Sequence, residues 1–534
     1  MLQRRLPTSS PRLAVLLAVA LAGCGGGAGP GASVDATPAF EGAAVEPAFH
    51  MAPAQLDEPS ADEAASAAPR HFEIDASVAG LPTARLTPAT LAERLATLQR
   101  LHVEAAGTKP PVPPVFATVY TPSQIRAAYG LPALPPVGAR LSAAEAATFG
   151  AGQTIYLVDA FDHPNAAADL ARFSAKFGLP GCTTVALTPR TALPLAAAGA
   201  SCTFSVAWTD SGSALKSAAP AYDAQWIAEI ALDVQWAHAI APLARLVLIE
   251  VDAANSNSMQ GGVRLADRMG AGVVSMSFGA REGSWVRVAD TAFATAGMTY
   301  VAAAGDDGAQ ALWPAVSPRV LAVGGTSLTW SGAGTRRESA WAGSGGGTSA
   351  YEPLPAWQAG TPVPGAGAAR MRTVSDVAFN ANPVTGQYAA LTARGAATTS
   401  WNAYGGTSIG APQWAGLVAV ANARRVAAAK PLLGDFHATL YRTIAASAAT
   451  RAADLADIVD GNDGACATCA AAVGYDTVTG WGTPNAGALL DTLASADTPP
   501  APPTLSLLAT KAGAAIPDAP QARVPAPSVR LFTR

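Results

Sequence analysis

The sequence predicts an α/β fold: a doubly wound, mainly parallel sheet with helices on both faces. Continuous apolar runs are found at residues 154–160, 245–251, 272–279, 299–308 and 319–325. Such runs are typical of strands buried on both sides of a parallel sheet. Helical patterns occupy the intervening segments 169–178, 224–240 and 261–270. This alternation predicts the doubly wound arrangement, in which functional sites gather beyond the carboxyl ends of the strands.

Composition restricts the class of partner. The 534-residue chain is 50% hydrophobic and 13% charged, with a formal net charge of −4 and a pI of about 5.9. A chain of this length and apolar content can bury a large core. It lacks the basic excess typical of nucleic-acid-binding proteins, so we expect no nucleic-acid partner.

The N-terminus predicts export. Arg4, Arg5 and Arg12 border the apolar stretch 13–22, which is too short to span a bilayer. The sequence Leu-Ala-Gly-Cys at 21–24 resembles a bacterial lipobox, whose cysteine carries the lipid. We therefore predict a lipoprotein signal peptide over 1–24 and a lipid on Cys24 that holds the protein at a bacterial outer membrane. The alternative is an ordinary signal peptide, which would make the protein periplasmic or extracellular.

Changes in composition divide the remaining chain into three parts. Residues 25–115 are predicted to be a tether or short pro-like segment, because 25 to about 70 is rich in Ala, Gly, Pro and acidic residues. Leucines at helical spacing predict one amphipathic helix at 85–106. Residues 116–496 are predicted to form the globular domain. The Pro/Ala-rich tail, 497–534, is predicted to be poorly ordered.

Four cysteines follow Cys24, an even number that favours two disulfides in an exported protein. Four cysteines allow three pairings, of which proximity in the sequence favours Cys182–Cys202 and Cys466–Cys469. The Cys-x-x-Cys run at 466–469 could instead be half of a zinc site. No second Cys-x-x-Cys or His-x-x-x-His motif accompanies it, so we favour the disulfide.

The run YGGTSIGAP, residues 404–412, makes Ser408 a candidate nucleophile. Its glycines permit a tight turn and a close approach of backbone to a ligand. The apolar stretch that follows predicts a helix beginning near Ser408, with Pro412 in its first turn. A helix N-terminus offers free N–H groups and a positive dipole end to an anion forming beside Ser408. The alternative is that Ser408 only caps the helix.

A serine nucleophile needs a neighbouring base, which is usually a histidine. The chain has six histidines: His50, His71, His102, His163, His238 and His437. The first three precede the predicted domain. His163 lies outside any motif typical of a catalytic histidine, and His238 lies among apolar residues of a predicted helix. The histidines therefore offer no clear base.

Two carboxylates offer one instead. Glu229 and Asp233 are four residues apart in the predicted helix 224–240, on one face and one turn apart. Two acids among apolar neighbours are costly unless they are paired, and close like charges raise one pKa so that the pair can share a proton. Such a pair can accept the proton of Ser408 in mildly acidic solution. The alternative is the exposed acidic edge of an amphipathic helix.

Asp306 is a candidate donor to an oxyanion. It lies in the run AGDDG, residues 304–308, directly after a predicted strand. Acids in glycine-rich loops often only make turns. A carboxylic acid that its surroundings keep neutral can, however, donate a hydrogen bond to a tetrahedral oxyanion. Low pH would favour this donor and the shared proton of the carboxylate pair alike.

These segments, in this order, resemble the sedolisin (serine-carboxyl peptidase) family. Matching runs across residues 119–490 are YTPSQIRAAYGLP, DAFDHPNAAADLARFSAKFGLP, EIALDVQWAHAIAP, VVSMSFG, AAGDDG, GGGTS before YEPLPAWQ, SDVAFNANPVTG, GGTSIGAPQWAGL and GYDTVTGWGTPN. The resemblance implies a subtilisin-like fold and peptide cleavage at acidic pH. It assigns Ser408 as nucleophile, Glu229 as base, Asp233 as the partner of that base and Asp306 as oxyanion donor. Asp306 is preferred to Asp307 because the family motif places the acid directly after glycine.

The resemblance also implies one structural Ca²⁺ near the C-terminus. The matching positions are Asp457 and Asp476, which would supply carboxylates, and Ile458, Ala472 and Gly474, which would supply backbone carbonyls. Calcium takes six to eight such hard oxygen ligands. Ala472 stands where the family usually has glycine, a change that keeps the carbonyl. The alternative is a pair of acidic turns without metal.

The resemblance also leads to expectations about regulation, about the substrate pocket and about the kind of protein this is. Family members usually carry a large N-terminal prodomain that blocks the site, but only about 90 residues separate Cys24 from the predicted domain, so we expect no full prodomain. Loops such as 200–222 and 280–290 are expected to form the substrate pocket. The leading hypothesis is a monomeric endopeptidase, less favoured as an exopeptidase, acting on proteins or peptides. The alternatives are a non-catalytic surface lipoprotein with the same fold and a subtilisin-type Ser-His-Asp enzyme.

Overall fold

The computed structural model describes residues 42–75, 78–104, 115–136, 138–365 and 370–497, with side chains described except at 98–104. The predicted signal peptide with Cys24 and most of the predicted C-terminal tail lie outside these residues. The described residues, all from Gly42 onward, belong to one compact unit. Within the described residues, no helix is both long and apolar enough to cross a membrane.

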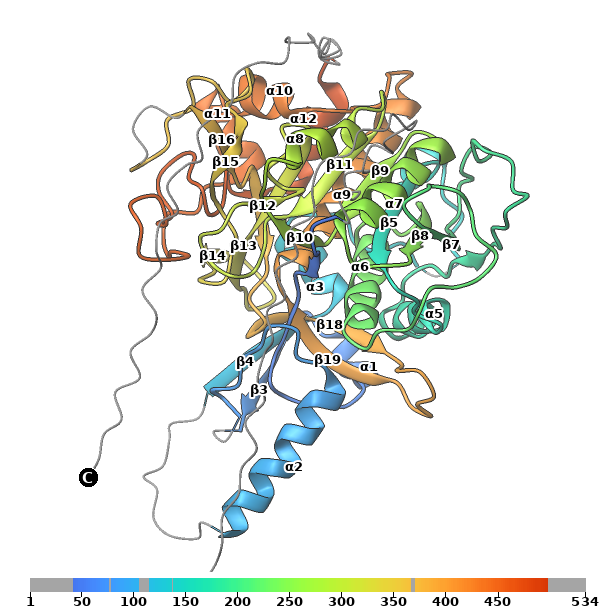
Figure 1. Ribbon diagram of the computed structural model, residues 1–534, viewed down its shortest axis with the longest axis vertical. Coiled ribbons are helices and arrows are strands. Elements are labelled where there is room, and N and C mark those ends of the chain that lie inside the picture. The colour runs from blue at the N-terminus through green and yellow to red at the C-terminus, as the bar shows by residue number, and fades with distance from the viewer. Residues whose placement is uncertain (1–41, 76–77, 105–114, 137, 366–369, 498–534) are drawn as a thin grey trace, which may run out of the picture. The chain divides into compact units, whose positions relative to one another are not determined.

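The central sheet has nine strands, ordered β14-β13-β11-β9-β5-β8-β7-β6 with β17 beside β13 (Figure 1). Their bounds are β5 Thr154–Ala160, β6 Thr183–Thr184, β7 Thr203–Thr209, β8 Arg245–Val251, β9 Val273–Met276, β11 Thr299–Ala303, β13 Val320–Thr329, β14 Arg337–Ala340 and β17 Val377–Asn380. Every pairing along the sheet is parallel except that of β13 with β14. The prediction of a mainly parallel sheet is therefore confirmed.

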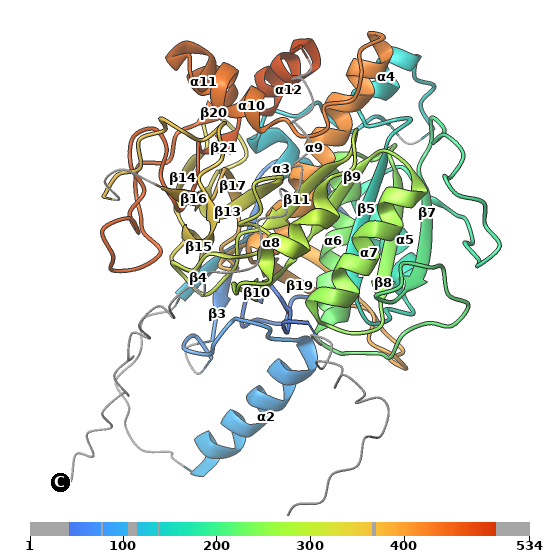
Figure 2. The ribbon, with the colours of Figure 1, turned by 45° about the horizontal axis from the view of Figure 1, so that its top comes forward.

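Helices cover both faces of this sheet. The four that matter most are α5 Ala166–Phe177, α6 Trp226–Ile240, α7 Ser256–Met269 and α9 Thr407–Ala427. Along β5, Ile155 and Leu157 belong to the apolar core that contains α6 and α9, whereas Tyr156 and Val158 belong to the core that contains α7. Figure 2 shows α7 lying in front of β5 and β8. The alternating side chains of a strand thus feed two separate cores, which is why these runs are apolar throughout.

The predicted elements agree with the structure apart from their ends. The runs 154–160 and 245–251 coincide with β5 and β8. The run 272–279 is divided between β9 and β10 (Phe278–Arg281), and β11 ends at Ala303, so that 304–308 is a loop. In the segment 200–222, residues 203–209 form β7 of the central sheet instead of a loop.

A five-stranded sheet, ordered β2-β19-β18-β4-β3, packs beside the first. Its strands are β2 His50–Met51, β3 Arg70–Ile74, β4 Val115–Tyr120, β18 Thr385–Leu391 and β19 Ser400–Gly405. Two of them, β2 and β3, come from the segment predicted to be a tether. They are short, and the open edges of β19 and β4 supply their backbone partners. The prediction of an unstructured tether is therefore wrong for residues 42–75.

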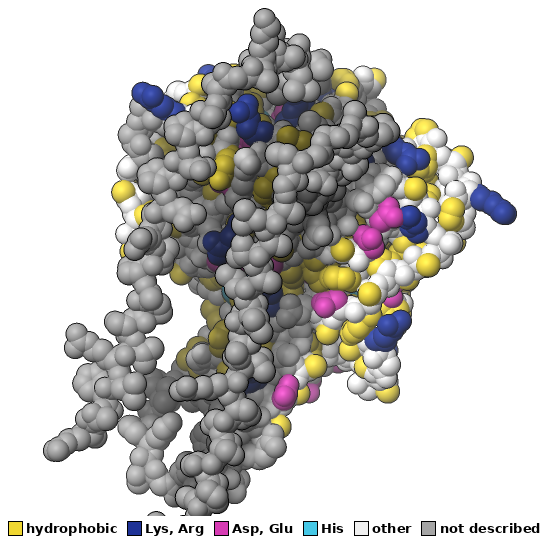
Figure 3. Space-filling model, in the orientation of Figure 1, with side chains coloured by type: hydrophobic (Ala, Val, Ile, Leu, Met, Phe, Trp, Pro, Cys, Tyr) yellow, Lys and Arg dark blue, Asp and Glu magenta, His cyan; other side chains and the backbone are white. Residues whose placement is uncertain are grey.

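The remaining elements are short or peripheral. They are β1 Glu46–Pro47, α1 Ala61–Ala65, α2 Pro88–Glu104, α3 Pro122–Ala128, α4 Ala143–Ala147, α8 Val286–Ala289, η1 Asp290–Phe293, β12 Leu312–Trp313, β15 Gly347–Pro353, β16 Met371–Val374, α10 His437–Thr439, η2 Leu440–Ile444, α11 Ala448–Asp454, β20 Leu455–Ala456, β21 Thr483–Pro484 and α12 Ala486–Ser495. Helix α2 confirms the helix predicted at 85–106. On the face shown in Figure 3, described side chains of both charge signs are scattered among apolar ones.

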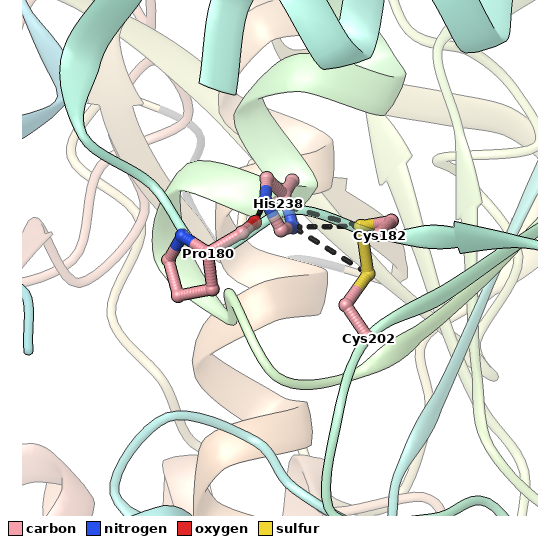
Figure 4. Close-up of a disulfide and its surroundings, with 4 residues drawn as sticks. All are labelled: Pro180, Cys182, Cys202 and His238. Atoms are coloured by element: carbon pink, nitrogen blue, oxygen red, sulfur yellow. Dashed lines mark hydrogen bonds between the residues drawn. A yellow bond between two sulfur atoms is a disulfide. The ribbon is translucent and has the colours of Figure 1, made fainter. Parts of the chain in front are cut away.

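Both predicted disulfides are present. Cys182 pairs with Cys202, and Cys466 pairs with Cys469. The latter bond removes the zinc alternative, because a disulfide leaves no thiolate to bind metal. Figure 4 shows His238 beside the first disulfide, with Nε2 2.7 Å from the carbonyl oxygen of Pro180. His238 is thus a packed core residue.

Candidate active site

Ser408 lies at the start of α9, as the sequence predicts. Strand β19 ends at Gly405, and Gly406 then turns the chain with a φ of 100°, a conformation that favours glycine. A Cβ on Gly406 would lie 2.4 Å from the carbonyl oxygen of Ala48 and 2.5 Å from Asp306 Oδ2. The turn therefore needs glycine for both its dihedral angle and its space, because Ala48 and Asp306 lie against Gly406.

The Ser408 hydroxyl meets the predicted base. Ser408 Oγ donates to Glu229 Oε2 at 3.0 Å, although the two residues are 179 positions apart. A second acceptor, the Ser277 carbonyl oxygen, lies 3.1 Å from the same Oγ. Both Ser408 and Glu229 are fully buried. A hydroxyl aimed at a buried carboxyl group is the arrangement that allows proton removal as the oxygen attacks.

Asp233 lies one turn after Glu229 on α6, and Ser277 ties it to the nucleophile segment. Ser277 Oγ is 2.7 Å from Asp233 Oδ1 and 3.2 Å from the Ser408 carbonyl oxygen. That carbonyl is free because Pro412, four residues on, has no N–H to donate back. Pro412 is the sixth residue of α9 rather than part of its first turn, so the prediction for Pro412 is wrong. The missing N–H of Pro412 leaves the Ser408 carbonyl oxygen available as an acceptor for Ser277 Oγ.

Burial sets the proton affinity of this carboxyl pair. It raises the pKa of Glu229 well above its ordinary value, and the charges of Asp233 and Asp159 raise it further. The pKa of Asp233 is raised by the same causes, burial first and Asp159 second. Among the described residues, Glu229 Oε1 and Asp233 Oδ2 have no hydrogen-bond partner. The pair is therefore suited to holding a proton between them, and the alternative of an exposed acidic edge on α6 is wrong.

Asp159 is a third buried acid in this group, and the sequence analysis overlooked it. It is the penultimate residue of β5, and neither of its oxygens has a described hydrogen-bond partner. Burial raises its pKa to about 8. The available signal was its position, since an acid at the carboxyl end of a buried strand in a doubly wound sheet lies where sites form.

The high pKa of Asp159 predicts how stability depends on pH. The folded chain holds the proton up to about pH 8, whereas an unfolded chain releases it near the ordinary value of 3.8. The contribution of Asp159 to the free energy of unfolding is complete below about pH 3.8 and is lost as the pH rises toward 8. We expect the melting temperature to fall between about pH 4 and about pH 8, and to fall less in Asp159→Asn. Thermal melts at both pH values, with exposed Asp62→Asn as control, test this; equal slopes in the two variants would contradict it.

Asp306 occupies the predicted position beside Ser408. Its Oδ1 accepts from both the backbone N–H and the hydroxyl of Thr407, each at 2.7 Å. Its Oδ2 is buried and has no hydrogen bond among the described residues. Burial raises the pKa of Asp306 to about 8, although the Thr407 hydrogen bonds oppose the shift. The neighbouring Asp307 is exposed, so the geometry favours the residue that the sequence favours.

Residues 43–51, here called the strap, fill the cleft in front of Ser408. In β1, Glu46 and Pro47 pair antiparallel with Gly279 and Phe278 of β10. The Ala48 N–H donates to the Ser277 carbonyl at 3.2 Å, and the Ser408 N–H donates to the Ala48 carbonyl at 3.1 Å. The Ala48 backbone is therefore held between Ser277 and the N–H of Ser408.

The strap is anchored firmly on the far side of the Ala48–Phe49 bond. His50 and Met51 form β2 against β19, and Phe49 is buried in the main core. The Phe49 carbonyl accepts from the Arg85 N–H at 3.1 Å. The nine-residue strap thus lies against the site without a large prodomain, which fits the pro-like alternative predicted for residues 25–115.

His50 enters the site through the strap. Its Nε2 is 3.6 Å from Asp306 Oδ2, its Nδ1 is 2.7 Å from Thr83 Oγ1, and its ring meets the edge of Trp341. Burial lowers the pKa of His50 to about 4. It contacts the candidate oxyanion donor and forms no hydrogen bond with the nucleophile. No histidine with a described side chain hydrogen-bonds Ser408, whose hydroxyl donates to Glu229 instead.

Two pairs among the predicted calcium ligands are in contact in the C-terminal loops. The N–H of Gly474 donates to Asp457 Oδ2 at 2.8 Å, and the N–H of Ala472 donates to Asp476 Oδ2 at 3.1 Å. Ile458 follows Asp457 in the chain. Carboxylate and carbonyl oxygens are the ligand type that Ca²⁺ takes, and in this structure both Asp side chains accept backbone N–H groups.

Comparisons with known proteins agree with this fold and site. The Subtilase family model matches residues 224–474, which include α6, the 304–308 loop and Ser408. Over 242 residues the chain is 36% identical to kumamolisin of Bacillus sp. (strain MN-32), covering 40% of this chain and 42% of the relative. Over 229 residues it is 30% identical to sedolisin of Pseudomonas sp. (strain 101), covering 36% and 35%. The chain therefore matches less than half the length of each of these relatives.

A solved structure extends the similarity in fold. Pseudomonas sedolisin, described as a serine-carboxyl proteinase complexed with two molecules of pseudo-iodotyrostatin, superposes with a TM-score of 0.54. The match covers 71% of this chain and 99% of that one at 23% sequence identity. The fold is thus subtilisin-like. Together with the two partial sequence matches, this similarity supports a sedolisin-family peptidase.

Proposed function

We propose that the protein is an endopeptidase that hydrolyses peptide bonds in acidic solution with Ser408 as its nucleophile. The observation that carries the proposal is the 3.0 Å hydrogen bond from Ser408 Oγ to Glu229 Oε2, both fully buried. The strap supports the endopeptidase assignment, because it crosses the cleft on both sides of the Ala48–Phe49 bond. A site that binds polypeptide on both sides of the bond to be cut can cleave within a chain.

The proposed reaction begins with transfer of the Ser408 proton to Glu229 while Oγ attacks the substrate carbonyl carbon. Asp233 orients Glu229 and shares its proton. The oxyanion accepts a hydrogen bond from the Ser408 N–H, which now binds the Ala48 carbonyl, and one from protonated Asp306 Oδ2. Glu229 then returns the proton to the leaving amine. In the second half, water attacks the acyl ester by the same route and frees Ser408.

The electrostatics support an acidic working range. Asp306 can donate only while protonated, and its pKa of about 8 keeps it so in acid. The donor is lost as the pH rises through that value. At the acidic limit, the carboxyl pair loses the negative charge that accepts the Ser408 proton. We therefore place the activity below about pH 8 and above the pH at which the pair is fully protonated.

A pH–activity profile tests the proposal. Purified chain is incubated with casein across the pH range, alongside Ser408→Ala. We expect cleavage to be stronger in acidic solution than at about pH 9, and to be absent in the Ser408→Ala variant. A non-catalytic lipoprotein would leave casein intact at every pH. A subtilisin-type enzyme would instead gain activity toward alkaline pH.

We extend the proposal to one Ca²⁺ held by the carboxylates of Asp457 and Asp476 and the carbonyls of Ile458, Ala472 and Gly474. Bound calcium would stabilise the folded loops, by about 2.7 kcal/mol at a hundredfold excess over its Kd. We expect a chelator to lower the melting temperature, added Ca²⁺ to restore it, and Asp457→Asn to abolish the difference. The exposed neighbour Asp460→Asn is the control; an Asp457→Asn melt that still responds to Ca²⁺ would argue against this site.

Export is the last part of the proposal, with a lipid on Cys24 and protein or peptide substrates outside the cytoplasm. The apolar stretch and the Leu-Ala-Gly-Cys run at 21–24 support it. We also propose a monomer. Intact mass of the membrane-extracted protein, compared with Cys24→Ser, tests the lipid.

A further inference from the structure

The strap fixes which residue of a bound peptide faces the walls of the cleft. Ala48 donates its N–H to Ser277 and presents its carbonyl to Ser408, so Ala48 holds the position before the bond to be cut. Its side chain borders a cavity of about 400 Å³ that Gly279, Gly305 and Leu312 also line. These three residues therefore decide how large a side chain can enter beside Ser408.

Leu312 fills the slot between the two glycines. A Cβ on Gly279 would lie 2.6 Å from Leu312 Cδ1, and a Cβ on Gly305 would lie 2.7 Å from the same atom. Contacts this short do not occur between real carbon atoms, so the δ-methyl takes up the space that two glycines leave open. The slot is thus narrow enough for one apolar side chain, and Leu312 already occupies it.

The backbone holds Leu312 in place. In β12, Leu312 pairs with Arg281 and Trp313 pairs with Ala280 of β10, the strand that also binds the strap. Leu312 is 8% exposed, and the next residue, Trp313, is fully buried. This pairing fixes the Leu312 backbone beside the slot.

The rest of the cavity has both charged and apolar walls. Glu46, Arg85, Arg281 and Asp307 are charged, whereas Ala43, Ala44, Pro47, Ala84 and Ala280 are apolar. A large apolar side chain excluded from the slot would lie partly against the charged groups, where its apolar surface gains less. The methyl of Ala48 needs no such space.

We propose that Leu312 closes the specificity slot, so that this peptidase cuts after small residues such as alanine. The inference rests on the proposed function and adds its substrate class. It also accounts for the residue that the chain itself presents at this position.

The test uses quenched fluorescent peptides that copy residues 44–51 with Ala, Leu or Phe at the position of Ala48. For the wild-type chain we expect kcat/KM to be at least about tenfold higher for the Ala peptide than for the Phe peptide. In Leu312→Gly this ratio should shift toward Phe by at least about tenfold. Leu312→Ala should lie between the two, and the exposed Val288→Ala is the surface control.

Thermal stability gives a second readout that needs no catalysis. Ala48→Phe should lower the melting temperature of the wild-type chain, because the ring cannot enter the slot, and should lower it less in Leu312→Gly. A wild-type preference for Phe, or a ratio unchanged in Leu312→Gly, would overturn the inference while leaving the peptidase assignment intact. Absence of all cleavage would overturn the proposed function, and equal melting shifts in the two backgrounds would then overturn the slot as well.

Discussion

Glu229→Gln is expected to lower kcat/KM by about 10²- to 10⁴-fold, the usual contribution of a general base. Glutamine has nearly the same shape but cannot accept the proton that Ser408 Oγ now directs at Glu229 Oε2. The variant should fold, since it replaces a buried acid whose pKa is already raised with a neutral group. Steady-state kinetics on a peptide substrate, with a thermal melt of the same sample, measure both effects.

A matched control comes from another buried glutamate. Glu250 in β8 also has its pKa raised, to about 8, by burial, and its oxygens accept from the His163 N–H and the Trp208 indole. It makes no hydrogen bond to Ser408, so Glu250→Gln should retain most of the activity. If Glu229→Gln remained active and Glu250→Gln did not, the base would have been assigned to the wrong carboxyl group.

The second large effect concerns the strap. When the full chain is held at acidic pH, we expect it to cut itself between Ala48 and Phe49 and yield a fragment beginning at Phe49. The Ser408 N–H already binds the Ala48 carbonyl at 3.1 Å, and the Ala48 N–H is held by Ser277 at 3.2 Å. Intact mass spectrometry over time measures the product, which should be absent from Ser408→Ala.

The structure also predicts what the cut chain retains. Phe49 is buried in the main core and Met51 pairs with β19, so the new N-terminus should remain attached to the fragment. Residues 43–48 are held by β1, by the Ala48 contacts, by hydrogen bonds of Ala43 and Val45 with Ser256 and Ala254, and by the Arg85–Glu46 ion pair, so we expect them to dissociate slowly after the cut. A first cut at any bond other than Ala48–Phe49 would contradict the register described above.

Much of the site could be read from local sequence because it depends on local patterns. Glu229 and Asp233 lie one turn apart on a helix, so their proximity follows from helix geometry. Ser408 lies just after a Gly-Gly turn, and residues other than glycine rarely adopt the backbone conformation of such a turn. The apolar runs 154–160 and 245–251 match β5 and β8 because strands buried on both faces admit few polar residues.

Other parts of the site carry no local signal. Strands β1 and β2 are two residues long, and their partners Gly279 and Tyr404 lie more than 200 residues away. A segment this short has no periodicity, and the free edge of another strand decides whether it folds. The many alanines of this segment favoured the prediction of a tether. The small side chain of one of them, Ala48, lets its backbone lie against Ser408.

The sequence by itself determined the doubly wound sheet, the helix that bears Glu229 and Asp233, and the turn that presents Ser408, because these follow from side-chain periodicity and glycine conformation. Only the tertiary structure decided that a strap covers the cleft, that His50 meets Asp306, and that Leu312 fills the space between Gly279 and Gly305. Each of these depends on which distant backbones approach one another, and such long-range contacts leave no pattern in the residues nearby.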